Sequence, residues 1–155
     1  MATQTLTVDG NGNTISGWVA EGGSYTSVQS DDGATTKLYS PTLNDVRQFS
    51  LTNTSGLTGA TINSVTVYAK LANLAAYSAT TAIGVRTGST DYWSGNKTTT
   101  NMTYTLFSET WSTSPNTSSP WTAAELDALQ IGVKKTDGNG TRITYAYAVV
   151  DYTIS

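Results

Sequence analysis

The chain has 155 residues, enough for one domain with a hydrophobic core, and a net charge of −3. It contains no cysteine and no histidine, which excludes disulfides, thiolate and imidazole metal sites, and serine–histidine triads. Its eight Lys and Arg residues form no basic block, so nucleic acid is not an expected partner.

The composition favours an all-β domain. Charged residues make up only 12% of the chain, and 30 Thr and 17 Ser supply most of the surface polarity. Threonine is β-branched and suits a pleated strand. Nine Tyr and four Trp, together with many aliphatic residues, argue against disorder.

The N-terminus, "MATQTLTVDGNG", has neither a basic segment nor an apolar one. It therefore predicts no signal peptide, and no stretch approaches the roughly 20 apolar residues of a membrane helix. The expectation is a soluble protein made in a cytoplasm, with no membrane partner.

The first third of the chain alternates short strands with turns. "DGNGN" (residues 9–13) and "SDDGATT" (30–36) have the Asn, Asp and Gly content of turns. Residues 1–13 form a possible N-terminal arm. The expected strands cover residues 4–8, 14–20, 25–29, 37–40 and 46–52.

The middle of the chain contains the clearest strand, residues 62–72. Val65, Val67 and Leu71 alternate there with polar residues, which indicates one buried face and one wet face. "TDYWSGNKTTTN" (90–101) reads as a polar loop carrying Tyr92 and Trp93. The other expected strands are residues 80–89, 102–111, 131–135 and 141–155, and the last is apolar on both faces, as in a central strand or a subunit interface.

One short helix interrupts this pattern at about residues 122–129. Thr122 and Glu125 have the spacing of a capping box, in which each side chain satisfies the other residue's backbone N–H. Leu126 and Leu129 lie one turn apart and face the same way. Because a helix of two turns is not stable alone, its expected role is structural, covering one open end of a sandwich.

These elements together predict a single domain over residues 1–155. Eight or nine strands separated by turns, with one short capping helix, favour an antiparallel β-sandwich of jelly-roll-like form.

The sequence favours a binding or structural role over an enzymatic one. Asp91 and Glu109 are the only acids near aromatic residues outside turns, and they would have to converge in one cleft to hydrolyse a glycoside. A calcium site at "SDDGAT" or "DGNGN" is conceivable, but turn chemistry explains both segments. No cofactor is expected.

The aromatic residues suggest where binding occurs. Trp121 precedes the capping box, where a hydrophobic staple residue is expected. Tyr92 and Trp93 suit sugar stacking, assembly or packing beneath a loop, and these alternatives stay open.

"SPWTAAELDALQIGVKK" followed by "GTRITYAYAVVDYT" resembles the C-terminal half of a group of phage structural proteins. The matching positions are Pro120 to Thr122, Asp127 to Gln130, Gly132, Val133, Arg142 to Thr144 and Val150 to Tyr152. The segment "GATINSVTVYAKLA" resembles a strand that such proteins carry in mid-chain, so the resemblance covers roughly residues 59–153.

The resemblance implies a virion protein of the capsid decoration (cement) type. Such a protein would bind the major capsid protein on the capsid exterior, clamp neighbouring subunits and form a homotrimer. The N-terminal arm would pair with a neighbour by strand addition. The expected assembly or ligand contacts are Thr5, Thr7, Tyr92 and Trp93. The alternative function is a carbohydrate-binding module or adhesin of a phage tail or fibre, with a glycan as partner.

Overall fold

The structure, a computed structural model, describes residues 1–15, 18–21, 24–33, 35–74, 77–100 and 102–155. Within these ranges the chain forms ten strands, one α-helix and one 3-10 helix, so the all-β fold is confirmed. In chain order they are β1 (Ala2–Asn11), β2 (Val19–Glu21), η1 (Tyr25–Val28), β3 (Lys37–Ser40), β4 (Val46–Leu51), β5 (Ala60–Asn73), β6 (Ala79–Thr87), β7 (Thr90–Thr99), β8 (Thr105–Trp111), α1 (Ala123–Asp127), β9 (Gln130–Gly138) and β10 (Thr141–Ile154).

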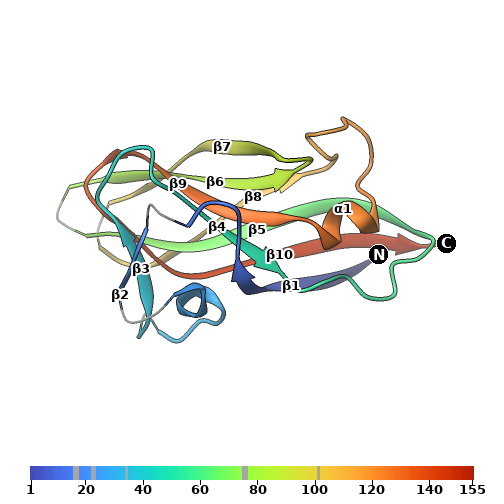
Figure 1. Cartoon of the computed structure of the whole chain (residues 1–155), viewed down its shortest axis with the longest axis horizontal. Helices are drawn as coiled ribbons and strands as arrows, with labels where there is room; N and C mark the ends of the chain where they lie inside the picture. The colour runs from blue at the N-terminus through green and yellow to red at the C-terminus, as the bar shows by residue number, and fades with distance from the viewer. Residues whose placement is uncertain (16–17, 22–23, 34, 75–76, 101) are drawn as a thin grey trace.

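The strands form two antiparallel sheets that pack as a sandwich (Figure 1). In the first, here the β10 sheet, β10 lies between β5 on one side and β1 and β3 on the other, with β2 and β8 at the edges. The second, here the β9 sheet, has the order β1-β4-β9-β6-β7. The jelly-roll-like sandwich expected from the sequence is therefore present.

β1 belongs to both sheets. Its residues 2–7 pair with β10, and from Val8 onward the strand pairs with β4, with a register shift between Val8 and Gly10. Within the expected N-terminal arm, residues 1–13, β1 is thus a strand of the fold itself. The physical reason is burial, because Leu6 and Val8 are both core residues.

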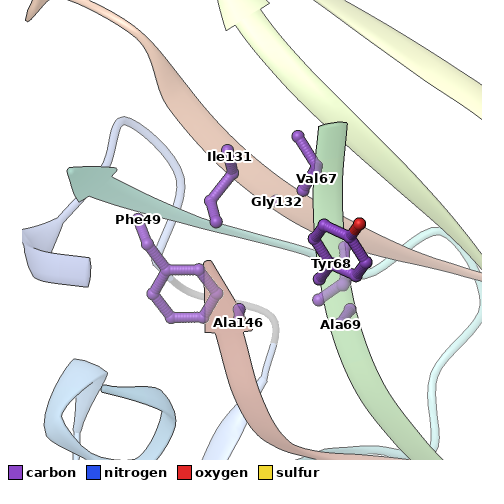
Figure 2. A pocket seen from close by; sticks show the side chains of 8 residues that line it. Phe49, Val67, Tyr68, Ala69, Ile131, Gly132 and Ala146 are labelled. Atoms are coloured by element: carbon purple, nitrogen blue, oxygen red, sulfur yellow. The ribbon is translucent and has the colours of Figure 1, made fainter. Parts of the chain in front are cut away.

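The core lies between the two sheets. Figure 2 shows Phe49 and Ile131 of the β9 sheet together with Val67, Ala69 and Ala146 of the β10 sheet around this interior. The space among these side chains is too small to hold a water molecule. This region is therefore packed core, in which apolar burial stabilises the sandwich, and it is not a binding cavity.

β10 is a central strand, as its two apolar faces predict. A register shift between Ile143 and Tyr145 changes the alternation predicted for this strand. Ile143 therefore faces the core, while Tyr145, Tyr147 and Val149 lie on the outer face, each partly exposed.

α1 packs at the end of the sandwich where both chain termini lie (Figure 1). Leu126 and Leu129 enter the core, and Trp121, only 3% exposed, donates its indole N–H to the Trp111 carbonyl at 3.0 Å. The expected end-covering helix is confirmed. No helix among the described residues has the length and apolarity to cross a bilayer.

Three local expectations were wrong. Residues 25–29 form the 3-10 helix η1, which buries Ser27 and Val28. The segment at residues 9–13 continues β1 as far as Asn11, because Gly10 and Gly12 allow the backbone to approach β4 closely instead of reversing the chain. Residues 90–99 form β7 and not a loop. Of the strand expected at 14–20, residues 16–17 lie outside the described part.

Candidate functional site

Tyr92 and Trp93 lie side by side in β7 but face opposite ways. Tyr92 pairs with Val85 and packs against the core, where its hydroxyl donates to Asn116 at 3.4 Å. Trp93 pairs with Gly84 and lies on the outer face of the β9 sheet. The adjacent aromatic residues therefore do not form a joint surface, because successive side chains of a strand alternate between its faces.

Trp93 lies directly over Gly84. A Cβ atom at position 84 would come within 2.4 Å of the indole ring. Glycine is thus required at position 84 for the indole ring to pack against the sheet there. The side chain remains partly exposed. Cε3 and Cζ3 are the ring atoms nearest to position 84, so the six-membered ring of the indole packs on the sheet there, and the exposed part of the side chain can contact a ligand.

Gly132 extends this surface on the neighbouring strand. It pairs with Gly84 on one side and with Gln48 on the other. A Cβ atom at position 132 would lie 2.9 Å from Gln48 Cγ and 2.7 Å from the Arg47 carbonyl oxygen. The Gln48 side chain therefore crosses Gly132 as the Trp93 ring covers Gly84. Below, the group formed by Gln48, Gly84, Asp91, Trp93 and Gly132 is called the tryptophan platform; Trp93 and Asp91 are its partly exposed members, and Gln48 is buried.

A hydrogen-bond network fixes one carboxylate on the platform. Gln48 Nε2 donates to Asp91 Oδ1 at 2.8 Å, and Arg86 Nη1 donates to the same oxygen at 2.7 Å. Gln48 is only 1% exposed, and its side-chain oxygen accepts the Thr14 N–H at 3.1 Å. This second hydrogen bond fixes the position of the Gln48 side chain. Asp91 Oδ2 accepts no hydrogen bond from the described part of the chain. It remains available to a hydroxyl donor.

Two cationic side chains flank the glycine pair along the strands. Lys134 lies two residues after Gly132 in β9, and its ammonium group lies 5.9 Å from the Trp93 ring centroid. Arg86 lies on the other side of the row, opposite Gln130. Next to Arg86 is a pocket of about 260 Å³, lined by Arg86, Thr87, Gly88, Ser89, Ala128 and Gln130. The platform therefore continues into a polar hollow.

The expected contacts Thr5 and Thr7 lie on the opposite side of the molecule, on the outer face of the β10 sheet. They pair with Val149 and Tyr147, respectively. The Tyr147 ring stacks on Tyr68 at 4.7 Å and 8°. Burial, with Tyr145 and Tyr68 nearby, raises the pKa of the Tyr147 phenol. The Tyr147 ring therefore has both Tyr68 and Tyr145 beside it, each at a centroid distance of 4.7 Å.

Thr122 and Glu125 form the expected capping box. The Thr122 hydroxyl accepts the Glu125 N–H at 3.2 Å, and Glu125 Oε2 accepts the Thr122 N–H at 2.9 Å. Both side chains are used by the helix N-terminus, so their role is structural.

The acidic residues do not converge. Asp91 lies on the outer face of the β9 sheet, whereas Glu109 pairs with the buried Val67 and forms an ion pair with Lys97 at 2.8 Å. The cleft that glycoside hydrolysis would need is not formed by these two residues.

The described residues of the segment 30–36, which omit residue 34, have the contacts of a turn. The Asp32 carboxylate accepts from the Thr36 hydroxyl at 2.6 Å and from the Thr35 and Thr36 N–H groups. Across the described ranges, no group of three or more acidic side chains is placed to hold a metal ion.

Sequence reasoning found Trp93, considered Asp91 only as a possible catalytic acid, and missed Gln48, Gly84 and Gly132. The overlooked signal is a repeated triplet: Ile83-Gly84-Val85 precedes Arg86, and Ile131-Gly132-Val133 precedes Lys134. The two triplets pair in antiparallel register. This pairing places Gly84 opposite Gly132 on the outer face of the sheet and buries the Ile and Val side chains on its inner face.

No protein-family model matches the chain, and no curated protein matches it in sequence. Solved structures do match its fold. The carbohydrate-binding module CBM6cm-2 of Cellvibrio mixtus lichenase 5A, in complex with cellotriose, has a TM-score of 0.50 at 12% identity, over 99% of each chain. The CBM22-1 xylan-binding domain of Paenibacillus barcinonensis Xyn10C has a TM-score of 0.51 at 14% identity, over 98% of this chain and 94% of that one.

A third similar structure is a truncated AlyQ with CBM32 and alginate lyase domains. Its TM-score is 0.52 at 16% identity, over 99% of this chain and 35% of that one, so the present chain spans about a third of its length. At these identities the three likenesses show a shared β-sandwich fold.

Proposed function

We propose that the chain is a non-catalytic glycan-binding domain and that the tryptophan platform is its binding surface. The observation that carries this proposal is the Trp93 indole lying over Gly84, two residues along β7 from a carboxylate oxygen with no partner in the described chain. Sugar rings have an apolar face edged by hydroxyl groups, so a flat aromatic ring beside fixed polar groups suits them.

The arrangement assigns a role to each side chain. The Trp93 ring stacks on a sugar ring, and Asp91 Oδ2 accepts a hydrogen bond from a sugar hydroxyl group. Gln48 and Arg86 hold Asp91 in place, which reduces the ordering cost of binding. The fold likeness to two carbohydrate-binding modules supports the proposal at the level of the scaffold.

A glycan array followed by isothermal titration calorimetry tests this function. The array identifies the glycans that the wild-type protein binds, and Trp93→Ala should abolish binding to them. The matched control is Tyr77→Ala, since Tyr77 is 76% exposed and lies between β5 and β6, outside the strands that form the platform. Equal binding by wild type and Trp93→Ala, or no glycan bound by the wild type, would overturn the proposal.

The second candidate is a virion protein on the capsid exterior that clamps neighbouring capsid subunits. The sequence resemblance to phage structural proteins favours it, as does the outer face of the β10 sheet. There, Thr5 and Thr7 adjoin Tyr147 and its neighbours, and faces rich in tyrosine and hydroxyl groups are suited to protein contact. Light scattering should then give a homotrimer in solution. A monomer that does not sediment with capsids would contradict this candidate.

A further inference from the structure

The charge on the tryptophan platform points to a more specific ligand. We infer, on the basis of the proposed function, that the platform selects acidic saccharides, meaning glycans that carry carboxylate or sulfate groups. The supporting observation is that Lys134 and Arg86 flank the Gly84–Gly132 pair, while Asp91, the acid of the platform, lies directly opposite Arg86.

The two cations differ in their partners, because among the described residues Arg86 is in an ion pair and Lys134 is not. Arg86 forms an ion pair with Asp91 at 2.7 Å, which neutralises that carboxylate. Lys134 is in no salt bridge with any described residue, and its ammonium group lies within 5.9 Å of the Trp93 ring centroid. Because Arg86 and Asp91 neutralise each other, the unpaired charge that the described residues place next to the Trp93 ring is the positive charge of Lys134, although the whole chain has a net charge of −3.

The position of Lys134 makes this charge relevant to a bound sugar. A saccharide stacked on Trp93 would bring its ring substituents within reach of the ammonium group. A carboxylate or sulfate there would form a charge-assisted hydrogen bond, which is stronger than one to a neutral hydroxyl.

Arg86 supplies a second cationic contact on the far side of the glycine row. Only its Nη1 is engaged by the described residues, so the other guanidinium nitrogens remain able to donate. Arg86 also lines the 260 Å³ pocket beside the platform. Arg86 and Lys134 lie four residue rows apart, or about 13 Å along the strands. An oligosaccharide with repeated acidic groups could therefore contact both cations, whereas a single sugar could not.

Calorimetry with three kinds of oligosaccharide tests the inference: homogalacturonan fragments carrying carboxylates, carrageenan fragments carrying sulfates, and neutral cello- and xylo-oligosaccharides. At least one acidic class should bind about tenfold or more tightly than the neutral ones, and added salt should weaken that binding. Lys134→Gln should remove most of this preference. The control, Lys70→Gln, changes a lysine on the β10 sheet and should leave the preference unchanged.

The outcomes separate the two proposals. Tight binding of neutral glycans, lost in Trp93→Ala but unaffected by Lys134→Gln, would overturn the acidic preference and leave glycan binding standing. Absence of binding to every saccharide would overturn both. Acidic binding that survives Trp93→Ala would mean a general charge attraction, which also contradicts the inference.

Discussion

Gly84 and Gly132 face each other in register across β6 and β9, and each is covered by a side chain from the next strand outward. Trp93 of β7 lies over the first, and Gln48 of β4 lies over the second. Glycine normally weakens a strand interior, so two glycines in register have a local cost. Here they leave room on the sheet for the indole ring and for the amide that fixes Asp91.

Gly84→Ala should displace Trp93. The new Cβ would lie 2.4 Å from the ring and 2.8 Å from the Tyr92 carbonyl oxygen, so ring and backbone must both shift. We expect a loss of about 1–3 kcal/mol in the free energy of unfolding, measured by urea denaturation, together with a change in tryptophan fluorescence. Gly95→Ala is the control, since a Cβ there meets open space. Equal stability of the two variants would contradict the close packing of Trp93 on Gly84.

Thr122→Ala should weaken α1 and the end of the core that it covers. The substitution removes the hydroxyl that accepts the Glu125 N–H, at an expected cost of about 1 kcal/mol in the free energy of unfolding. Thr122→Ser keeps the acceptor and should lie close to wild type in chemical denaturation. If the serine variant lost as much stability as the alanine variant, the cap would not be the cause.

Asp32 should make stability depend on acid pH. The Thr36 hydroxyl is the main cause that lowers the pKa of Asp32 from its ordinary value of 3.8. The unfolded chain then binds the proton more readily, so this contribution is fully present above pH 3.8 and is lost as the pH falls through the lower folded pKa.

Urea denaturation between pH 5 and pH 2 measures this effect as the slope of stability against pH. Asp32→Asn should flatten the slope, and Thr36→Val, which removes the donating hydroxyl, should flatten it in part. An unchanged slope in both variants would show that these hydrogen bonds are not formed in solution.

The stacked pair Tyr68 and Tyr147 should be energetically coupled. Their rings lie 4.7 Å apart and nearly parallel, a geometry worth about 0.5–1.5 kcal/mol beyond the area buried. A double-mutant cycle with Tyr68→Ala and Tyr147→Ala measures this term directly. Simple additivity of the two losses would mean that the stack does not form in solution.

The sandwich could be predicted from the sequence because its strongest signals are local. The alternation in β5, the capping box before α1 and the apolar run of β10 each depend on a few neighbouring residues. β7 could not be predicted, since it is an edge strand whose exposed polar side chains give it the sequence pattern of a loop. The path of β1 from one sheet to the other was also hidden, because a register shift leaves no clear pattern in sequence.

Trp93 could be found as an isolated aromatic residue, but its neighbours could not. Gln48 and Asp91 are 43 positions apart in the chain and meet only because β6 and β9 separate their strands with glycine. Such a site depends on the register between strands that are far apart in the chain, and short sequence patterns do not determine that register.

The most direct test of glycan binding at the platform is NMR titration of the four tryptophan indole N–H signals with the tightest-binding saccharide. Trp18 and Trp121 use their indole N–H groups within the fold, bonding to the carbonyls of Asp45 and Trp111. We predict that the Trp93 signal shifts on binding while those of Trp18 and Trp121 stay in place. Saturable binding that leaves the Trp93 signal unmoved would contradict the assignment of the platform as the binding surface.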